Sequence, residues 1–201
     1  MVFLSFRLVP VVGRPAVFVD RDGTLNVEKN YLHRFEDWEW LPGAVEAIKA
    51  FNKAGFLVIV ISNQAGVARG MYSEADLNLL HVRVDDELRE LGARIDAYYY
   101  CPHHPEFGEE CICDCRKPAP GMLLRAVDDL AIDLSRSWMV GDKLTDVEAG
   151  HAANLNTILV RTGYGDNEAL LSEPGQIIVD NLLAACQYIL SRVVKTSISF
   201  T

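Results

Sequence analysis

Residues 16–24 read AVFVDRDGT, four apolar residues followed at once by two carboxylates, Asp20 and Asp22. The apolar run is β-branched and aromatic, which predicts a short buried strand that ends where the charge begins. A second run, residues 56–61, reads FLVIVI and predicts another buried strand. Between the two, residues 43–54 carry apolar side chains at helical spacing and are followed by a glycine, which favours a helix that stops there. The segment therefore predicts a strand–helix–strand unit.

The same alternation continues to the end of the chain. Further strands are expected at residues 97–100, 138–140, 157–160 and 176–179, and further helices at residues 73–91, 120–130, 145–153 and 181–192. Alternation of this kind predicts an α/β fold, with a Rossmann-like parallel sheet covered by helices on both faces. Residues 163–175 are the longest expected loop late in the chain. Because such sheets bind ligands beyond the carboxyl ends of their strands, the residues after each strand are the candidates for function.

The composition sets limits on size and partners. With 201 residues, half of them hydrophobic, the chain is expected to form one domain over residues 1–201, with its core at about residues 14–192. A net charge of -9 and a pI near 5 disfavour nucleic acid and anionic membranes, which need a basic surface. No run reaches the roughly 18 apolar residues of a membrane span. Residues 1–12 are interpreted as a leader strand or an extension, and we expect a monomer.

The two carboxylates after the first strand suit phosphate chemistry. A carboxylate such as Asp20 can attack phosphorus and form an acyl phosphate, which divides hydrolysis into two easier displacements. A second carboxyl two residues later, Asp22, can protonate the leaving alcohol and then activate water. The pair alone could be a solvated turn, but its place behind a buried strand and before Gly-Thr favours a catalytic role.

Two further segments supply possible phosphate ligands. The second strand ends in Ser62, Asn63 and Gln64, whose hydroxyl and amides could donate to a phosphoryl oxygen. These residues could equally form a loop with local caps. Arg116 and Lys117 precede an expected helix, where they could deliver positive charge to the strand ends or could form ordinary solvated surface.

The segment after the fourth strand points to a metal ion. Residues 141–146 read GDKLTD and provide a further pair of carboxylates, Asp142 and Asp146. Hard oxygen ligands with open water positions suit magnesium, which can bridge a carboxylate and a phosphate. An ordinary helix cap would give the same spacing, and the preceding buried strand and glycine favour the metal.

These four segments, in this order and each near a strand end, resemble the haloacid dehalogenase phosphatases. The resemblance implies that Asp20 is the nucleophile and Asp22 the general acid and base. Ser62 and Lys117 would stabilise the phosphoryl group. Magnesium would be held by Asp20, Asp142 and the backbone carbonyl of Asp22.

A cysteine-rich stretch lies just before Lys117. Four of the five cysteines fall within residues 101–115, closer together than a disulfide framework places its bridges. A free thiol cluster or a disulfide is the alternative to a metal here, and the crowding favours zinc and a reducing cytoplasm. A closed tetrahedral zinc site that staples a loop would use Cys101, His103, Cys113 and Cys115. Cys111 or His104 could replace one of these ligands.

Residues 16–163 also resemble a narrower family, the bacterial heptose 1,7-bisphosphate 7-phosphatases. The matching segments are DRDGTLN at 20–26, NQAGVARG at 63–70, CPHHP at 101–105, CDCRK at 113–117, PGMLL at 120–124 and VGDK at 140–143. That family removes the 7-phosphate of D-glycero-D-manno-heptose 1,7-bisphosphate on the route to ADP-heptose and lipopolysaccharide, or to related surface glycans. It lacks a large cap domain, and this chain has no room for one.

The resemblance also implies substrate contacts. By position these come from Glu28, Lys29, Asn30, Tyr31, Asn63, Gln64, Ala65, Arg116 and Lys143. Arg116 is the candidate for the second phosphate, because a guanidinium can bind two phosphate oxygens at once. Two residues depart from the family pattern: Ser62 stands where threonine is more typical, and Ala65 replaces a common serine.

Two other functions remain open from the sequence. Histidinol-phosphate phosphatases share the nucleophile and often a zinc loop. A catalytically silent, zinc-stapled binding module would keep the fold for partner contacts, but such a protein should have lost at least one of Asp20, Asp22, Lys117 or Asp142. All four are present.

Overall fold

The computed structural model describes residues 13–107 and 113–198, the last five of these by their backbone alone. Its centre is a sheet of six strands in the order β3-β2-β1-β4-β5-β6. The strands are β1 (Ala16–Val19), β2 (Leu57–Asn63), β3 (Ala97–Cys101), β4 (Trp138–Gly141), β5 (Asn156–Val160) and β6 (Ile177–Val179). Every neighbouring pair is parallel, which confirms the predicted sheet.

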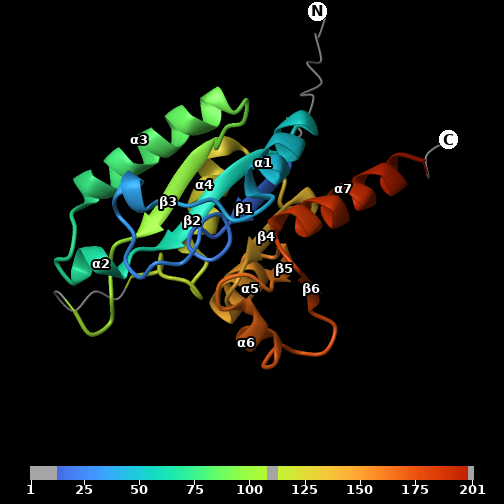
Figure 1. The fold of residues 1–201 in the computed structure, drawn as a ribbon. Coiled ribbons are helices and arrows are strands. Elements are labelled where there is room, and N and C mark those ends of the chain that lie inside the picture. The colour runs from blue at the N-terminus through green and yellow to red at the C-terminus, as the bar shows by residue number, and fades with distance from the viewer. Residues whose placement is uncertain (1–12, 108–112, 199–201) are drawn as a thin grey trace, which may run out of the picture.

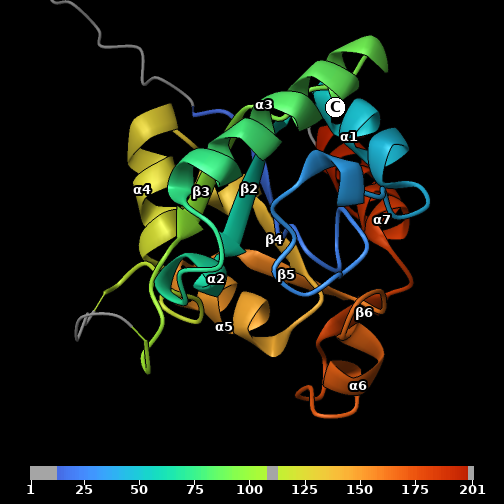
Figure 2. The same cartoon turned by 60° about the vertical axis from the view of Figure 1, so that its left-hand side comes forward.

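Helices cover both faces of the sheet, as predicted. One face carries α1 (Ala44–Lys53), α3 (Glu74–Glu90) and α7 (Leu182–Ile198), and the other carries α4 (Gly121–Leu130) and α5 (Leu144–Ala152). Figure 2 shows α4 on one side of the strands and α1 and α7 on the other.

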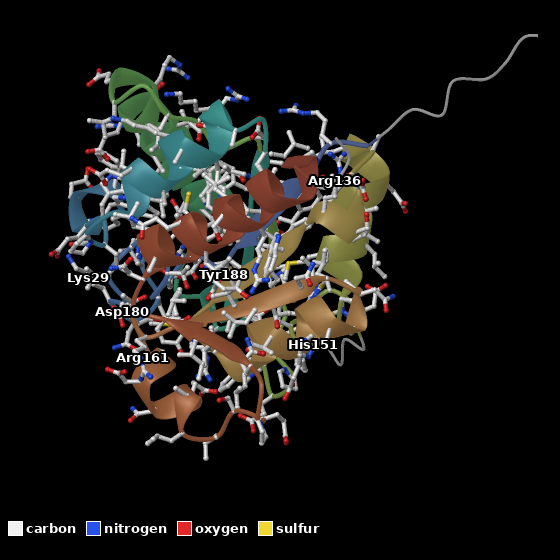
Figure 3. All side chains as sticks on the ribbon, turned by 90° about the vertical axis from the view of Figure 1, so that its right-hand side faces the viewer. Lys29, Arg136, His151, Arg161, Asp180 and Tyr188 are labelled. Carbon is white, nitrogen blue, oxygen red and sulfur yellow. The ribbon has the colours of Figure 1, made fainter. Side chains whose placement is uncertain are left out.

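The buried side chains of β1 divide between these two layers. Val17 and Val19 belong to the core under α1, α3 and α7, while Ala16 and Phe18 belong to the core under α4 and α5. This alternation follows from the two-residue period of a strand. On α7 the ring of Tyr188, which Figure 3 labels, lies below that helix. It meets the Trp138 ring edge-on, with 5.9 Å between centroids, and so packs the helix against β4.

Some local structure differs from the sequence prediction. The expected loop at residues 163–175 contains a short helix, α6 (Gly165–Ala169), which is too brief to show a helical period. Glu168 of this helix accepts a hydrogen bond from the backbone N–H of Leu144 at 3.0 Å, which ties α6 to the start of α5. The last helix continues to Ile198 rather than ending at residue 192.

The connections at the strand ends contain short helices and no inserted domain within the described residues. They are η1 (Phe35–Asp37), α2 (Ala65–Ala68) and, further along, η2 (Leu134–Arg136). In Figure 1, α2 follows directly on the arrowhead of β2. The predicted leader at residues 1–12 and Cys111 lie outside the described residues. None of the described helices is long and apolar enough to cross a membrane.

Candidate active site

Polar residues from the neighbouring strands β1, β2 and β4 converge on one pocket of about 460 Å³. Its lining contains the predicted residues Asp20, Asp22, Glu28, Asn30, Tyr31, Ser62, Asn63, Gln64, Ala65, Arg116, Lys117 and Lys143. It also contains Asp146, which the sequence offered as a metal-binding carboxylate, and Tyr72, Thr145 and Tyr164, which were not assigned to the site from the sequence. The parallel arrangement explains the convergence, because all carboxyl ends lie at one edge of the sheet.

Three carboxylates and one ammonium form the floor of the site. One oxygen from each of Asp20, Asp142 and Asp146 lies within 4.8 Å of the others, and all three residues are buried. Lys117 Nζ lies 2.8 Å from Asp20 Oδ1 and 2.6 Å from Asp146 Oδ1. Burial and then the nearby charge of Asp20 raise the pKa of Asp142 to about 8. Fully ionised, the three carboxylates would carry more negative charge than the single lysine balances, and Asp142 avoids this in part by holding its proton more tightly.

The donors of this cluster fit a hard divalent cation. Asp142 Oδ1 is buried without a hydrogen-bond partner, while its Oδ2 accepts from the backbone N–H of Tyr164 at 2.8 Å. A Cβ at Gly23 or Gly163 would collide with the Asp142 carboxylate, so glycine backbone is what allows the loops to close around it. Carboxylate oxygens with room for water suit magnesium.

The carboxylate trio differs in one member from the predicted magnesium ligands. Asp146 joins Asp20 and Asp142, while the carboxylate of Asp22 is not part of the cluster. The predicted contact through the backbone carbonyl of Asp22 stays a prediction. The sequence named Asp146 together with Asp142 as the carboxylate pair of this segment, and the structure places Asp146 in the first turn of α5, close to Asp142.

Asp22 lies in a ring of donors. Arg21 donates to both of its oxygens, over 3.0 Å from Nε and 3.1 Å from Nη2. Asn26 and Gln64 add hydrogen bonds of 3.0 and 3.1 Å. Burial opposes ionisation, but the charge of Arg21 and these hydrogen bonds together hold the pKa of Asp22 below its usual value. Asp22 is therefore an ionised carboxylate in the free protein.

Arg21 is a residue of the site that the sequence reasoning missed. Its side chain is 1% exposed, and Nη2 also donates to the backbone oxygen of Leu32 at 2.8 Å. An arginine between two carboxylates was the available signal. Because such residues are usually exposed, only the fold shows that this one is directed inward.

The end of β2 holds the predicted phosphoryl ligands. Ser62 is 3% exposed, and its Oγ accepts a hydrogen bond from Gln64 Nε2 at 2.6 Å. The side-chain amide of Asn63 donates to Lys117 O and accepts from Lys117 N. Both ends of this amide therefore already have a hydrogen-bond partner within the protein. Ala65 begins α2 at the pocket wall.

The outer part of the pocket has its own cations. Lys143 Nζ lies 4.3 Å from the centroid of the Tyr164 ring and 3.9 Å from Glu28 Oε2. Arg116 lines the pocket, and its Nη1 donates to the backbone oxygen of His103 at 3.0 Å.

Lys29 is the predicted substrate residue that does not line this pocket. Its Nζ lies 3.0 Å from Glu39 Oε2 instead, and it lies at the molecular surface in Figure 3. Its neighbours along the chain, Glu28 and Asn30, do reach the lining. Glu28 and Asn30 therefore reach the pocket, while Lys29 between them is directed away from it.

The four predicted zinc ligands come together next to Arg116, which contacts the backbone of His103. Cys101 Sγ lies 3.2 Å from Cys115 Sγ, 3.7 Å from Cys113 Sγ and 3.7 Å from His103 Nδ1. All four ligand atoms lie within 4.8 Å of one another. A tetrahedral ion with bonds of about 2.0 to 2.3 Å places its ligand atoms nearly this far apart, so the donor set fits zinc. His104 is engaged elsewhere: its Nδ1 accepts from the backbone N–H of Glu106 at 3.1 Å.

Comparison with known proteins agrees with this geometry. A family model described as "HAD-hyrolase-like" matches residues 114–185. The D-glycero-beta-D-manno-heptose-1,7-bisphosphate 7-phosphatase of Escherichia coli (strain K12) is 48% identical over 153 residues, which are 74% of this chain and 80% of the relative. The protein of that name from Photorhabdus laumondii is 45% identical over 85% of this chain and 92% of its own length.

A solved structure is similar over nearly the whole fold. It is the D,D-heptose 1.7-bisphosphate phosphatase from B. bronchiseptica, complexed with magnesium and phosphate. The two chains are 31% identical and align with a TM-score of 0.81, covering 89% of this chain and 99% of the other.

Proposed function

This chain belongs to the heptose 1,7-bisphosphate 7-phosphatase family of haloacid dehalogenase-like hydrolases, and we propose that it removes the 7-phosphate of D-glycero-β-D-manno-heptose 1,7-bisphosphate through a phospho-aspartate on Asp20. One observation supports the mechanism above all. Asp20 ends β1 at the floor of the pocket, next to the Lys117 ammonium and to the two carboxylates Asp142 and Asp146. The nucleophile Asp20, the fixed ammonium of Lys117 and a candidate metal site therefore lie next to one another at the floor of the pocket.

In the first step Asp20 attacks phosphorus and the sugar alcohol leaves. Lys117 holds one oxygen of Asp20 and leaves the other free to attack. Lys117 and Ser62 stabilise the charge that develops on the phosphoryl oxygens. The alcohol needs a proton, for which Asp22 is the candidate donor. Because the entering phosphate is negative, it raises the pKa of the nearby Asp22 and favours proton uptake there.

In the second step water attacks the phospho-aspartate and regenerates Asp20. Asp22 accepts the proton of this water, a role that suits the ionised state in which Arg21 holds it. The same carboxyl therefore gives a proton in one step and takes one in the other. The ion pair with Arg21 favours the ionised form of Asp22, which is the form left after the carboxyl has given its proton to the alcohol.

Two metals are proposed as cofactors. Asp20, Asp142 and Asp146 would hold magnesium, which neutralises the carboxylate cluster and polarises the phosphoryl group when bound. The structural neighbour crystallised with magnesium and phosphate supports this assignment. Cys101, His103, Cys113 and Cys115 would hold a zinc ion that orders the loop before Arg116.

The relatives favour the heptose substrate over histidinol phosphate, since those reported above carry heptose bisphosphatase names. A silent binding module is disfavoured, because Asp20, Asp22 and Lys117 line the pocket and a carboxylate oxygen of Asp142 lies within 4.8 Å of one of Asp20. We also propose that the protein acts as a monomer in the cytoplasm, without nucleic-acid or membrane partners. Its net charge of -9 and its cluster of free cysteines support this placement.

A comparison of kcat/KM tests the proposed substrate. The purified protein with magnesium should hydrolyse heptose 1,7-bisphosphate with a kcat/KM well above that for histidinol phosphate. A small aryl phosphate serves as the control for general phosphatase activity. A preference for histidinol phosphate would refute the heptose assignment but not the phospho-aspartate mechanism.

A further inference from the structure

The hydroxyl of Tyr72 begins a chain of hydrogen bonds that leads to the reacting centre. It donates to Gln64 Oε1 at 2.6 Å. Gln64 Nε2 donates in turn to Ser62 Oγ at 2.6 Å and to Asp22 Oδ2 at 3.1 Å. Tyr72 and Gln64 are 7% and 2% exposed, so water competes little for these bonds.

The amide of Gln64 satisfies its neighbours in one orientation only. An ionised Asp22 accepts hydrogen bonds and donates none, so the amide nitrogen must face it. The amide oxygen then points to Tyr72, which supplies the hydrogen that it needs. With the amide reversed, an oxygen would face a carboxylate and a buried acceptor would be left unsatisfied. The Tyr72 hydroxyl is the group that opposes this reversal.

We propose that Tyr72 is a positioning residue for the reaction and acts through Gln64 on Ser62. Because Ser62 Oγ already accepts from Gln64, its own O–H remains available as a donor toward the pocket. A phosphoryl oxygen bound beside Lys117 is the acceptor that this donor suits. The inference rests on the proposed function only in that the bound group is a phosphoryl.

The ring of Tyr72 is held in place independently of its hydroxyl. It stacks on His33 with 4.8 Å between centroids and an interplanar angle of 14°. Gly66 approaches the ring so closely that a Cβ there would collide with Tyr72 Cε1 and Cζ. Substitution by phenylalanine should therefore keep the packing and remove the hydroxyl, which donates to Gln64 and also interacts with the backbone N–H of Gly66. The Gln64 background separates the first contact from the second.

The test is a double-mutant cycle. Tyr72→Phe should lower kcat by about two- to tenfold, the range that one hydrogen bond contributes, with a smaller change in KM. In a Gln64→Leu background the same substitution should cause no further loss. Gln64→Met provides a second background if the leucine variant does not fold. Heptose 1,7-bisphosphate and an aryl phosphate are both measured, because the contact is to the phosphoryl group that they share.

Tyr98→Phe is the matched control. It removes a hydroxyl that donates to Asp85 at 2.7 Å, outside the pocket, so kcat should stay at the wild-type value. Equal kcat for Tyr72→Phe and wild type would overturn the inference, as would losses that multiply in the double variant. If the cycle holds on the aryl phosphate while the heptose is not hydrolysed, Tyr72 keeps its role and the proposed substrate fails.

Discussion

The side chain of Asn63 and the backbone of Lys117 form a two-way pair across 54 residues of sequence: Asn63 Nδ2 donates to Lys117 O and Lys117 N donates to Asn63 Oδ1, each over 3.0 Å. This pair ties the end of β2 to the loop that follows the Cys101–Cys115 cluster of proposed zinc ligands. It fixes the backbone from which the Lys117 ammonium reaches Asp20.

We predict that Asn63→Asp lowers kcat by roughly tenfold, because the carboxylate can accept from Lys117 N but would repel Lys117 O. Steady-state kinetics on an aryl phosphate measures the change. Asn52 forms the same two-way pair with the backbone of Arg94, at 3.1 and 2.9 Å, outside the pocket. Asn52→Asp should reduce thermal stability and leave kcat intact. Equal kcat losses in both variants would contradict a specific role for the Asn63 pair.

Asp20→Asn is expected to lower kcat by at least about a thousandfold, because an amide keeps the shape of the side chain but cannot act as the nucleophile. Thermal stability should change little, since the substitution also removes one of three crowded carboxylates and Lys117 keeps Asp146 as its partner. Asp128→Asn, on the exposed face of α4, is the control and should be fully active. Activity above a thousandth of wild type would refute the phospho-aspartate mechanism.

We predict one zinc ion per chain, lost in Cys113→Ser. Elemental analysis of the purified protein measures the metal content, and Cys186→Ala, which alters a buried thiol of the core, should retain zinc in full. Cys113→Ser should lower kcat/KM more for the bisphosphate than for an aryl phosphate, because zinc is expected to order the loop rather than to take part in the chemical step. Stoichiometric zinc in Cys113→Ser would instead make Cys111 or His104 a ligand.

Arg116→Ala is expected to lower kcat/KM for heptose 1,7-bisphosphate by about ten- to a hundredfold, which corresponds to about 1.5 to 3 kcal/mol for a charge-assisted hydrogen bond. The contact with His103 O holds the guanidinium beside the zinc cluster, so little freedom is lost on binding the distal phosphate. A small monophosphate should be hydrolysed as before. Arg125→Ala, which changes a residue on the exposed face of α4, is the control. Parallel losses on both substrates would place Arg116 at the reacting phosphate.

Buried His81 should make the protein less stable in mild acid. Burial, and then the charge of Arg21, lower the pKa of His81 to about 3. The imidazole ring packs against the aromatic rings of Tyr98 and Tyr100. Below the unfolded pKa of about 6.5 the unfolded chain takes up a proton that the native state does not, so stability is lost as pH falls. The loss between pH 7 and pH 5 should reach about 2 kcal/mol.

Urea denaturation at both pH values measures this effect. His81→Phe keeps the stacking on Tyr98 and removes the titrating group, so its stability should fall less between pH 7 and pH 5 than that of wild type. Other titrating groups are common to both proteins and cancel in the difference. An unchanged pH dependence in His81→Phe would show that His81 does not control acid stability.

The sequence alone determined the sheet and the edge at which the site lies. Runs such as residues 16–19 and 56–61 can only be buried strands when helical segments alternate with them, and parallel strands bring their carboxyl ends together. Asp20, Ser62 and Asp142 follow from that rule, since each stands at a strand end. The clustering of Cys101, His103, Cys113 and Cys115 was predicted from the kind and crowding of their side chains.

Tertiary structure decided which atoms meet at that edge. Asp146 lies beside Lys117, Arg21 is directed inward, and Tyr72 binds Gln64. Each of these contacts joins segments that are distant in the sequence or leave a strand end as a loop, so no residue spacing predicts it. The period of a strand or helix fixes a direction for its own side chains, but a loop residue takes its direction from the burial and hydrogen bonds that the rest of the fold offers it. For that reason Lys29 turned away from the pocket while its neighbours faced it.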